Sequence, residues 1–180
     1  VSIDNITLTA NNSQAVLGFG VNINLMSEKF GGRTRINIVG DFKNENGIHS
    51  WAFQKIKLNT VQIKADFGPA FSIDGSIDMM ENNPIYGDAI GGNVKAKFLN
   101  KIEVSAAALF GSTTGTSSYR YWFVDARANL PVGMMLLPPF SISGLGGGAY
   151  YHMRKSGNDM LNAGNFPAYV PDINTGLGIR

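Results

Sequence analysis

The chain reads Leu17-Gly18-Phe19-Gly20-Val21-Asn22-Ile23-Asn24-Leu25 near its start, and this stretch decides its fold. Every second residue is apolar, and glycine or asparagine stands between the apolar residues. A strand places successive side chains on opposite faces of a sheet, so this alternation is typical of a strand with one apolar face. The stretch therefore predicts a half-buried β-strand.

The same period of two continues through most of the chain. Alternating apolar residues recur in six further stretches, 36–42, 56–67, 71–79, 94–98, 102–110 and 122–130. Within 56–67 the parity changes, because Ile56 and Leu58 hold even positions whereas Val61 and Ile63 hold odd ones. We expect a bulge or tight bend near Asn59-Thr60, which would keep one face apolar. Helical spacing is absent except for a turn or two around 159–163.

Turn-forming residues separate these stretches. Examples are Gly68-Pro69, Asn82-Asn83-Pro84 and Thr114-Gly115. Short turns favour antiparallel pairing, since parallel strands need crossover helices that the pattern does not contain. We expect an all-β antiparallel meander of about eight or nine strands with almost no helix, arranged as a sandwich, an open sheet or a barrel.

The domain organisation follows from the length of 180 residues. We expect a single β-rich domain over 1–180, or a segment of a larger repetitive chain. A weak internal repeat relates residues 20–68 to residues 75–111, because each part contains a Gly-Gly pair and ends on Phe-Gly. Repeats of this kind usually mean that a sheet grows by copies of one unit.

Charge and cysteine content exclude several classes of function. Fifteen basic and thirteen acidic residues give a net charge of +2, so the chain has no strong field that would attract nucleic acid. The absence of cysteine excludes disulfides, thiolate nucleophiles and cysteine-ligated zinc, and it is compatible with export. The longest apolar stretch is broken by Gly133, Pro138 and Pro139, so no membrane-spanning helix is predicted.

Residues suited to catalysis are few and scattered. His49 and His152 are the only histidines, and neither lies in a recognisable motif, so both are expected on the surface. Asp74 and Asp78 share one face of a strand but lie about 13 Å apart, too far to share an ion. We expect Lys95 and Lys97 to pair with them across a hairpin. The sequence therefore predicts no enzyme, no catalytic residue, no cofactor and no metal.

Two segments contain residue types that occur in ligand-binding loops, but neither predicts a particular ligand. The segment 78–88 is rich in oxygen donors but lacks the alternating spacing of calcium loops, so we expect a structural turn. The second segment, Gly144-Leu145-Gly146-Gly147-Gly148-Ala149, matches the residue pattern of a dinucleotide-binding loop. Such a loop must be followed by a helix, however, and no apolar residues at helical spacing follow here. We expect a glycine-rich strand beneath bulky neighbours such as Tyr121 and Trp122. Ligand-binding residues stay unknown.

One connection is conspicuously apolar. It runs from Pro131 to Phe140 and would form a large exposed patch if it projected into water. Its prolines disfavour a central strand, so we expect a lid-like segment that packs across an end of the β-structure or contacts other domains or copies of the same protein. The candidate contact residues are Val132, Met134, Met135, Leu136, Leu137 and Phe140.

Aromatic residues gather at the expected strand ends, among them Phe67, Phe71, Phe98, Phe110 and Trp122. Such residues close the core of a soluble sandwich, or they form girdles at the two interfaces of a membrane-spanning barrel. The number and length of the strands suit a small outer-membrane barrel. The apolar 131–140 connection opposes that arrangement, because barrel loops are polar.

The middle and later parts of the chain resemble very large β-rich exported or surface proteins of Gram-negative bacteria of the Bacteroidetes type, over about residues 70–155. The resemblance is carried by the segments Phe71-Ser72-Ile73-Asp74-Gly75-Ser76-Ile77, Asn83-Pro84-Ile85-Tyr86-Gly87-Asp88, Tyr119-Arg120-Tyr121-Trp122-Phe123-Val124-Asp125-Ala126 and Gly146-Gly147-Gly148-Ala149-Tyr150-Tyr151. It implies a structural piece of a long exported, envelope-associated chain, at the cell surface or the outer membrane. It assigns no functional residues.

The expected function is therefore a structural or adhesive segment of a large exported bacterial envelope protein. The alternative is an outer-membrane or lipid-handling β-barrel, and a third reading is a soluble β-domain that binds a small ligand. Expected partners are other domains or copies of the same protein, with envelope or membrane association and no nucleic acid.

Overall fold

The chain forms one long antiparallel meander. The computed structural model describes residues 1–26, 29–45, 48–156 and 169–180, and within these ranges the side chains of 44, 45, 48, 49, 131–134, 136 and 137 are not described. The described part contains twelve strands and no helix, which confirms the predicted all-β meander. The strands are β1 (Ser2–Ala10), β2 (Gln14–Met26), β3 (Phe30–Glu45), β4 (Ile48–Asp66), β5 (Phe71–Asn83), β6 (Gly87–Phe98), β7 (Ile102–Ser112), β8 (Arg120–Leu137), β9 (Phe140–Tyr151), β10 (Met153–Lys155), β11 (Tyr169–Pro171) and β12 (Gly178–Ile179).

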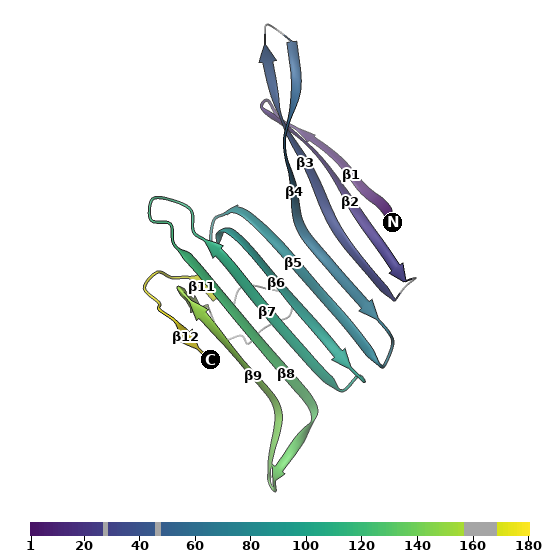
Figure 1. Cartoon of the computed structure of the whole chain (residues 1–180), viewed down its shortest axis with the longest axis vertical. Helices are drawn as coiled ribbons and strands as arrows, with labels where there is room; N and C mark the ends of the chain where they lie inside the picture. Colours follow the sequence, from purple (N-terminus) through teal and green to yellow (C-terminus); the bar gives the residue numbers. More distant parts are fainter. Residues whose placement is uncertain (27–28, 46–47, 157–168) are drawn as a thin grey trace.

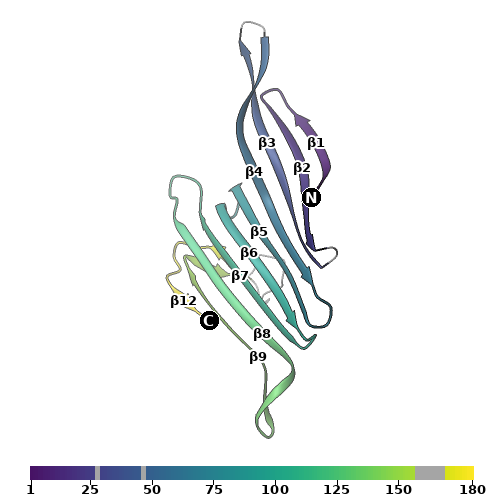
Figure 2. The ribbon, with the colours of Figure 1, turned by 45° about the vertical axis from the view of Figure 1, so that its right-hand side comes forward.

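Ten strands build the main sheet, slightly more than the eight or nine expected. Strands β1 to β9 lie side by side in chain order, and β12 returns to pair with β9 (Figure 1). Strands β10 and β11 form a separate two-stranded sheet. Among the described residues the main sheet is open, with β1 at one edge and β12 at the other, and Figure 2 shows its curvature.

The predicted parity change in the fourth strand is confirmed. Thr34 of β3 lies opposite Val61 of β4, whereas Ile36 lies opposite Leu58, so β4 has one residue more than β3 over this interval. The extra residue belongs to the Asn59-Thr60 pair. This bulge returns the apolar side chains of β4 to one face on both sides of it.

Two turns have glycine at a position where the backbone favours it. Gly68 and Gly87 both have a φ of +66°, a conformation that favours glycine. At Gly87 a β-carbon would also collide with the backbone of Ser112 on the neighbouring strand. Asn83 supports the β5–β6 turn, because its Oδ1 accepts hydrogen bonds from the backbone N–H groups of Ile85 and Tyr86 at 2.9 and 3.0 Å.

The Pro131 to Phe140 segment is not the lid that we expected. It continues β8 to Leu137 and turns into β9 at Phe140, so it is a hairpin that extends beyond β7 (Figure 1). The pairing of β8 with β9 is interrupted between Asn129 and Met134, and Pro131 lies inside this irregularity. Because a proline needs no hydrogen-bond partner for its nitrogen, the interruption allows the strand to continue.

The buried core lies on one face of β7 to β9. It consists of Leu109, Tyr121, Phe123, Met153 and Tyr169. Met153 and Tyr169 belong to the small β10–β11 sheet, which therefore covers this part of the main sheet. The ring of Tyr169 stacks on that of Phe123 with centroids 4.7 Å apart.

Candidate functional site

The strand register divides the main sheet into an apolar and a polar face. Residues opposite one another in adjacent strands share a face, so each row of partners crosses the sheet. One row crosses all ten strands as Ile3, Val21, Thr34, Val61, Ile77, Gly92, Ala108, Val124, Ala149 and Ile179. We call the face that carries this row the apolar face.

The next row belongs to the opposite side, which we call the polar face. It runs through Ser2, Asn22, Arg33, Gln62, Ser76, Asn93, Ala107, Asp125 and Gly148. The contrast between the two rows confirms that the alternation in the sequence sorts side chains by polarity. It does so across the whole width of the sheet.

The apolar face has no cover among the described residues. Ile77 is 43% exposed, Ile90 47% and Val124 39%, although all three are large apolar residues in the middle strands. The described core lies on the other face, beneath β10 and β11. Exposed apolar surface on this scale marks a contact with another protein or with lipid.

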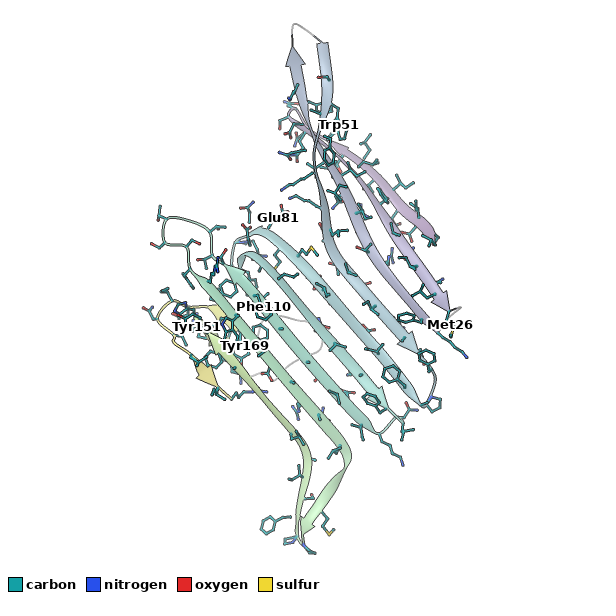
Figure 3. All side chains as sticks on the ribbon, in the orientation of Figure 1. Met26, Trp51, Glu81, Phe110, Tyr151 and Tyr169 are labelled. Atoms are coloured by element: carbon teal, nitrogen blue, oxygen red, sulfur yellow. The ribbon has the colours of Figure 1, made fainter. Side chains whose placement is uncertain are left out.

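Aromatic and large aliphatic residues border the apolar face at both ends. At one end Phe71 contacts Phe67 and Phe98, with ring centroids 6.3 and 5.2 Å apart. At the other end a single row contains Met79, Ile90, Phe110, Trp122 and Tyr151, of which Phe110 and Tyr151 are labelled in Figure 3.

The apolar band between these borders has a constant height. It covers nine residues on each of four neighbouring strands, 71–79, 90–98, 102–110 and 122–130. At the usual rise of a strand, each stretch spans about 26 Å.

A shallow hollow lies in the middle of the apolar face. Small residues line it, among them Gly92, Ala106, Ala108 and Gly147, together with Ile77 and Val124. Its volume is about 640 Å³. The hollow crosses several strands, because its lining residues belong to β5 through β9.

Ion pairs on the polar face differ from those predicted. Asp74 lies opposite Lys95 in the register, as expected for a hairpin pair. The lysine ammonium groups, however, contact Glu103 of β7, at 2.9 Å for Lys95 and 3.7 Å for Lys97. Asp78 instead accepts a hydrogen bond from the Thr60 hydroxyl at 2.6 Å. The sequence did not indicate that Glu103, which lies on the neighbouring strand β7, would contact both lysines.

The glycine-rich strand is confirmed as β9, but its neighbours are not the aromatic residues that we expected. Gly148 lies opposite Asp125, whose side chain is buried and accepts a hydrogen bond from Arg180 at 3.0 Å. A β-carbon on Gly148 would lie 2.6 Å from the Val124 carbonyl oxygen and 3.0 Å from the Asp125 carboxyl carbon. Glycine here makes room for the buried carboxylate of Asp125. The polar position of Asp125 within an alternating strand is its only sequence signal.

The buried tyrosines contact this ion pair or the adjacent turn. Tyr121 donates a hydrogen bond to the carbonyl oxygen of Tyr86, and the Tyr86 hydroxyl donates to the carbonyl of Tyr169 at 3.2 Å. Burial raises the pKa of the Tyr169 hydroxyl, and the charge of Asp125 raises this pKa further. The Tyr169 hydroxyl therefore stays protonated, and the hydrogen bond from Tyr86 ties β11 to the β5–β6 turn.

The remaining candidate residues do not converge on a site. Met135 and Phe140 of the contact segment are 69% and 70% exposed in the hairpin, and the side chains of Val132, Met134, Leu136 and Leu137 lie outside the described set. His152 stacks on Tyr151, and its Nδ1 lies 3.0 Å from the Arg120 carbonyl. The His49 side chain and residues 159–163 also lie outside the described residues.

The 78–88 segment uses its oxygen atoms internally. Asp88 accepts a hydrogen bond from the backbone of Asn82 at 2.8 Å, and Asn83 caps the turn as described above. Over the ranges that the structure describes, no three histidine or acidic side chains are grouped as metal ligands.

No family model, curated protein or solved structure matches this chain. In the described part of the chain, no helix is long and apolar enough to cross a membrane.

Proposed function

We propose that the chain is a structural segment of an outer-membrane type β-sheet, with its apolar face against lipid hydrocarbon. The observation that carries the proposal is the uncovered apolar band, nine residues high and bordered by aromatic residues at both ends. Transmembrane strands need about 9–11 residues, and barrels of this type carry an apolar band of about 25 Å between aromatic girdles. The band of about 26 Å has the corresponding height.

The polar face supports the same proposal. A membrane barrel faces an aqueous or polar interior with every second residue, and here that side carries the pairs of Lys95 and Lys97 with Glu103. The β10–β11 sheet lies over part of it. In the proposed setting this small sheet would fill part of the interior.

The two edges of the main sheet carry unpaired backbone groups, which the proposed membrane setting must satisfy. Lipid cannot satisfy free backbone N–H and C=O groups, so an open edge is not tolerated within the hydrocarbon. Further strands, from a longer chain or from a second copy, would have to pair with β1 at one edge and, at the other, with the part of β9 that the short strand β12 leaves unpaired. The membrane role thus requires assembly.

The hollow in the apolar face favours a second candidate, a structural segment whose apolar face packs against another β-sheet of an exported protein. Two sheets pack about 10 Å apart with interdigitating side chains. Large residues of a facing sheet would fill the hollow between Ile77 and Val124. The experiment therefore has to separate lipid from protein as the cover.

Single cysteines provide this test, because the chain has none of its own. Ala106→Cys reports on the apolar face, and the adjacent Ser105→Cys reports on the polar face as the matched control. Each variant carries a nitroxide label and is measured in lipid vesicles with oxygen and a water-soluble nickel complex as relaxation agents. We expect residue 106 to be accessible to oxygen and not to nickel, and residue 105 to show the opposite. A label at 106 that neither agent reaches would show a protein cover and refute the lipid contact.

A further inference from the structure

Strand β4 separates from its neighbour β5 over more than half of its length. It pairs with β3 from Ile48 to Ala65 but with β5 only from Thr60 to Asp66. Strand β5 in turn pairs only with β6 beyond Asp78. The two strands diverge as a fork, visible in Figures 1 and 2, and no strand of the described chain pairs with either inner edge. Such edges present unpaired backbone groups to an incoming strand.

A pocket occupies the fork. Its volume is about 850 Å³, and its lining includes Lys57, Asn59, Asp78, Glu81 and, from the neighbouring strands, Gln14 and Asn37. Ile56 and Leu58 also line the pocket, and their side chains lie on the opposite face of β4 from that of Lys57. The pocket therefore follows the backbone edge of β4.

Two lysines at the fork share one carboxylate. Glu81, which Figure 3 labels at the end of β5, contacts the Nζ atoms of Lys55 and Lys57 at 2.8 and 2.6 Å. These contacts raise the pKa of Lys55 and lower that of Glu81. On the β3 side the lysines lie opposite Val39 and Asn37, which carry no charge.

The other nearby carboxylates are already engaged. Asp78 accepts a hydrogen bond from Thr60, and Asp88 accepts one from the backbone of Asn82. The two lysines and Glu81 together leave one positive charge at the mouth of the fork.

We propose that the fork binds an extended peptide strand, which pairs with the free edge of β4 and places acidic residues beside Lys55 and Lys57. Strand addition to an open edge draws its affinity from backbone hydrogen bonds and its specificity from alternate side chains. On the opposite side of the added strand, apolar residues would lie beside Ile56 and Leu58. The partner is thus a segment of alternating acidic and apolar residues.

A second copy of the chain is the less suitable occupant. Antiparallel pairing of two β4 edges about a two-fold axis near Ile56 would place the lysines of one copy directly opposite those of the other. Like charges in directly opposed positions of a sheet are destabilising. An acidic partner removes this repulsion.

The test uses a nine-residue peptide of alternating glutamate and valine with blocked ends, added to the full chain. We expect saturable binding, with slowed amide exchange at residues 51–59 and little change at residues 62–65, which are already paired on both sides. Two further peptides carry N-methyl groups on alternate amides, one on each edge. At least one of them should bind about tenfold more weakly, since N-methylation removes the hydrogen bonds of one edge.

Charge variants of the chain test whether Lys55 and Lys57 attract the acidic residues of the peptide. Lys55→Glu with Lys57→Glu should weaken binding of the glutamate peptide at least about tenfold, whereas Glu81→Gln should strengthen it. Lys64→Gln is the control, because Lys64 lies on the same face of β4 in the paired region and the neutral side chain puts no carboxylate opposite Asp74. It should change the affinity less than about twofold.

Equal binding of all three peptides, or of the double lysine variant, would overturn the proposal. Protection of residues 51–59 that depends on protein concentration without peptide would show a second copy as the occupant and overturn it too. None of these readouts uses lipid, so the result is independent of the membrane proposal.

Discussion

At the residue scale, Gly148 is the position where a single methyl group has the clearest consequence. The β-carbon of an alanine would lie 2.6 Å from the Val124 carbonyl oxygen and 3.0 Å from the carboxyl carbon of Asp125. A shift of either neighbour would have a cost, because the first is strand backbone and the second is the buried carboxylate that pairs with Arg180. We therefore expect Gly148→Ala to lower the free energy of unfolding by about 1–3 kcal/mol.

Urea denaturation followed by circular dichroism measures this loss. Gly176→Ala is the matched control, because nothing lies within 4 Å of its added β-carbon. That control should change stability by no more than about 0.5 kcal/mol. Equal effects of the two substitutions would show that the crowding around Asp125 is relieved by small shifts of β9.

At the element scale, alternation predicts strands well and predicts their ends poorly. The parity change at Asn59-Thr60 was predictable because an apolar face must stay on one side of the sheet. The continuation of β8 through Pro131 was not, since it depends on a local interruption of the β8–β9 register. Side-chain contacts between strands that are distant in the chain could not be predicted from the sequence either. Arg180 and Asp125, for example, meet only because β12 returns to β9.

The β8–β9 hairpin was expected from its sequence to cap the core, but its exposed side chains predict only a small contribution to stability. Met135 and Phe140 are 69% and 70% exposed, so neither closes the described core. Met135→Ser and Phe140→Ser should each change the free energy of unfolding by less than about 0.5 kcal/mol. Leu109→Ala, at a fully buried position of β7, should cost about 2–5 kcal/mol in the same urea titration. A loss above about 2 kcal/mol at Met135 would restore the capping role.

At the scale of the whole molecule, most of the apolar surface lies outside any core. The buried hydrophobic residues in the described ranges are mainly those beneath β10 and β11, whereas the apolar face crosses all ten strands uncovered. Periodicity shows that one face is apolar, but a period of two is the same whether lipid or a second sheet covers it. For this reason the sequence predicted that the sheet has an apolar face but not what covers it, and the contact segment that it did suggest, 131–140, is a different part of the chain.

The choice of partner can be tested with a charge at the centre of the apolar band. Val94 lies midway along the apolar stretch of β6, and the adjacent Asn93 belongs to the polar face near Asp74 and Asp78. An arginine that faces the middle of a bilayer costs about 2–4 kcal/mol, whereas one on the interior face is tolerated. Val94→Arg should therefore reduce partitioning into lipid vesicles at least about 30-fold in a flotation assay, and Asn93→Arg should leave partitioning within about twofold of the original chain. Equal partitioning of both variants would mean that residue 94 does not face lipid. The second sheet would then be the better explanation of the uncovered face.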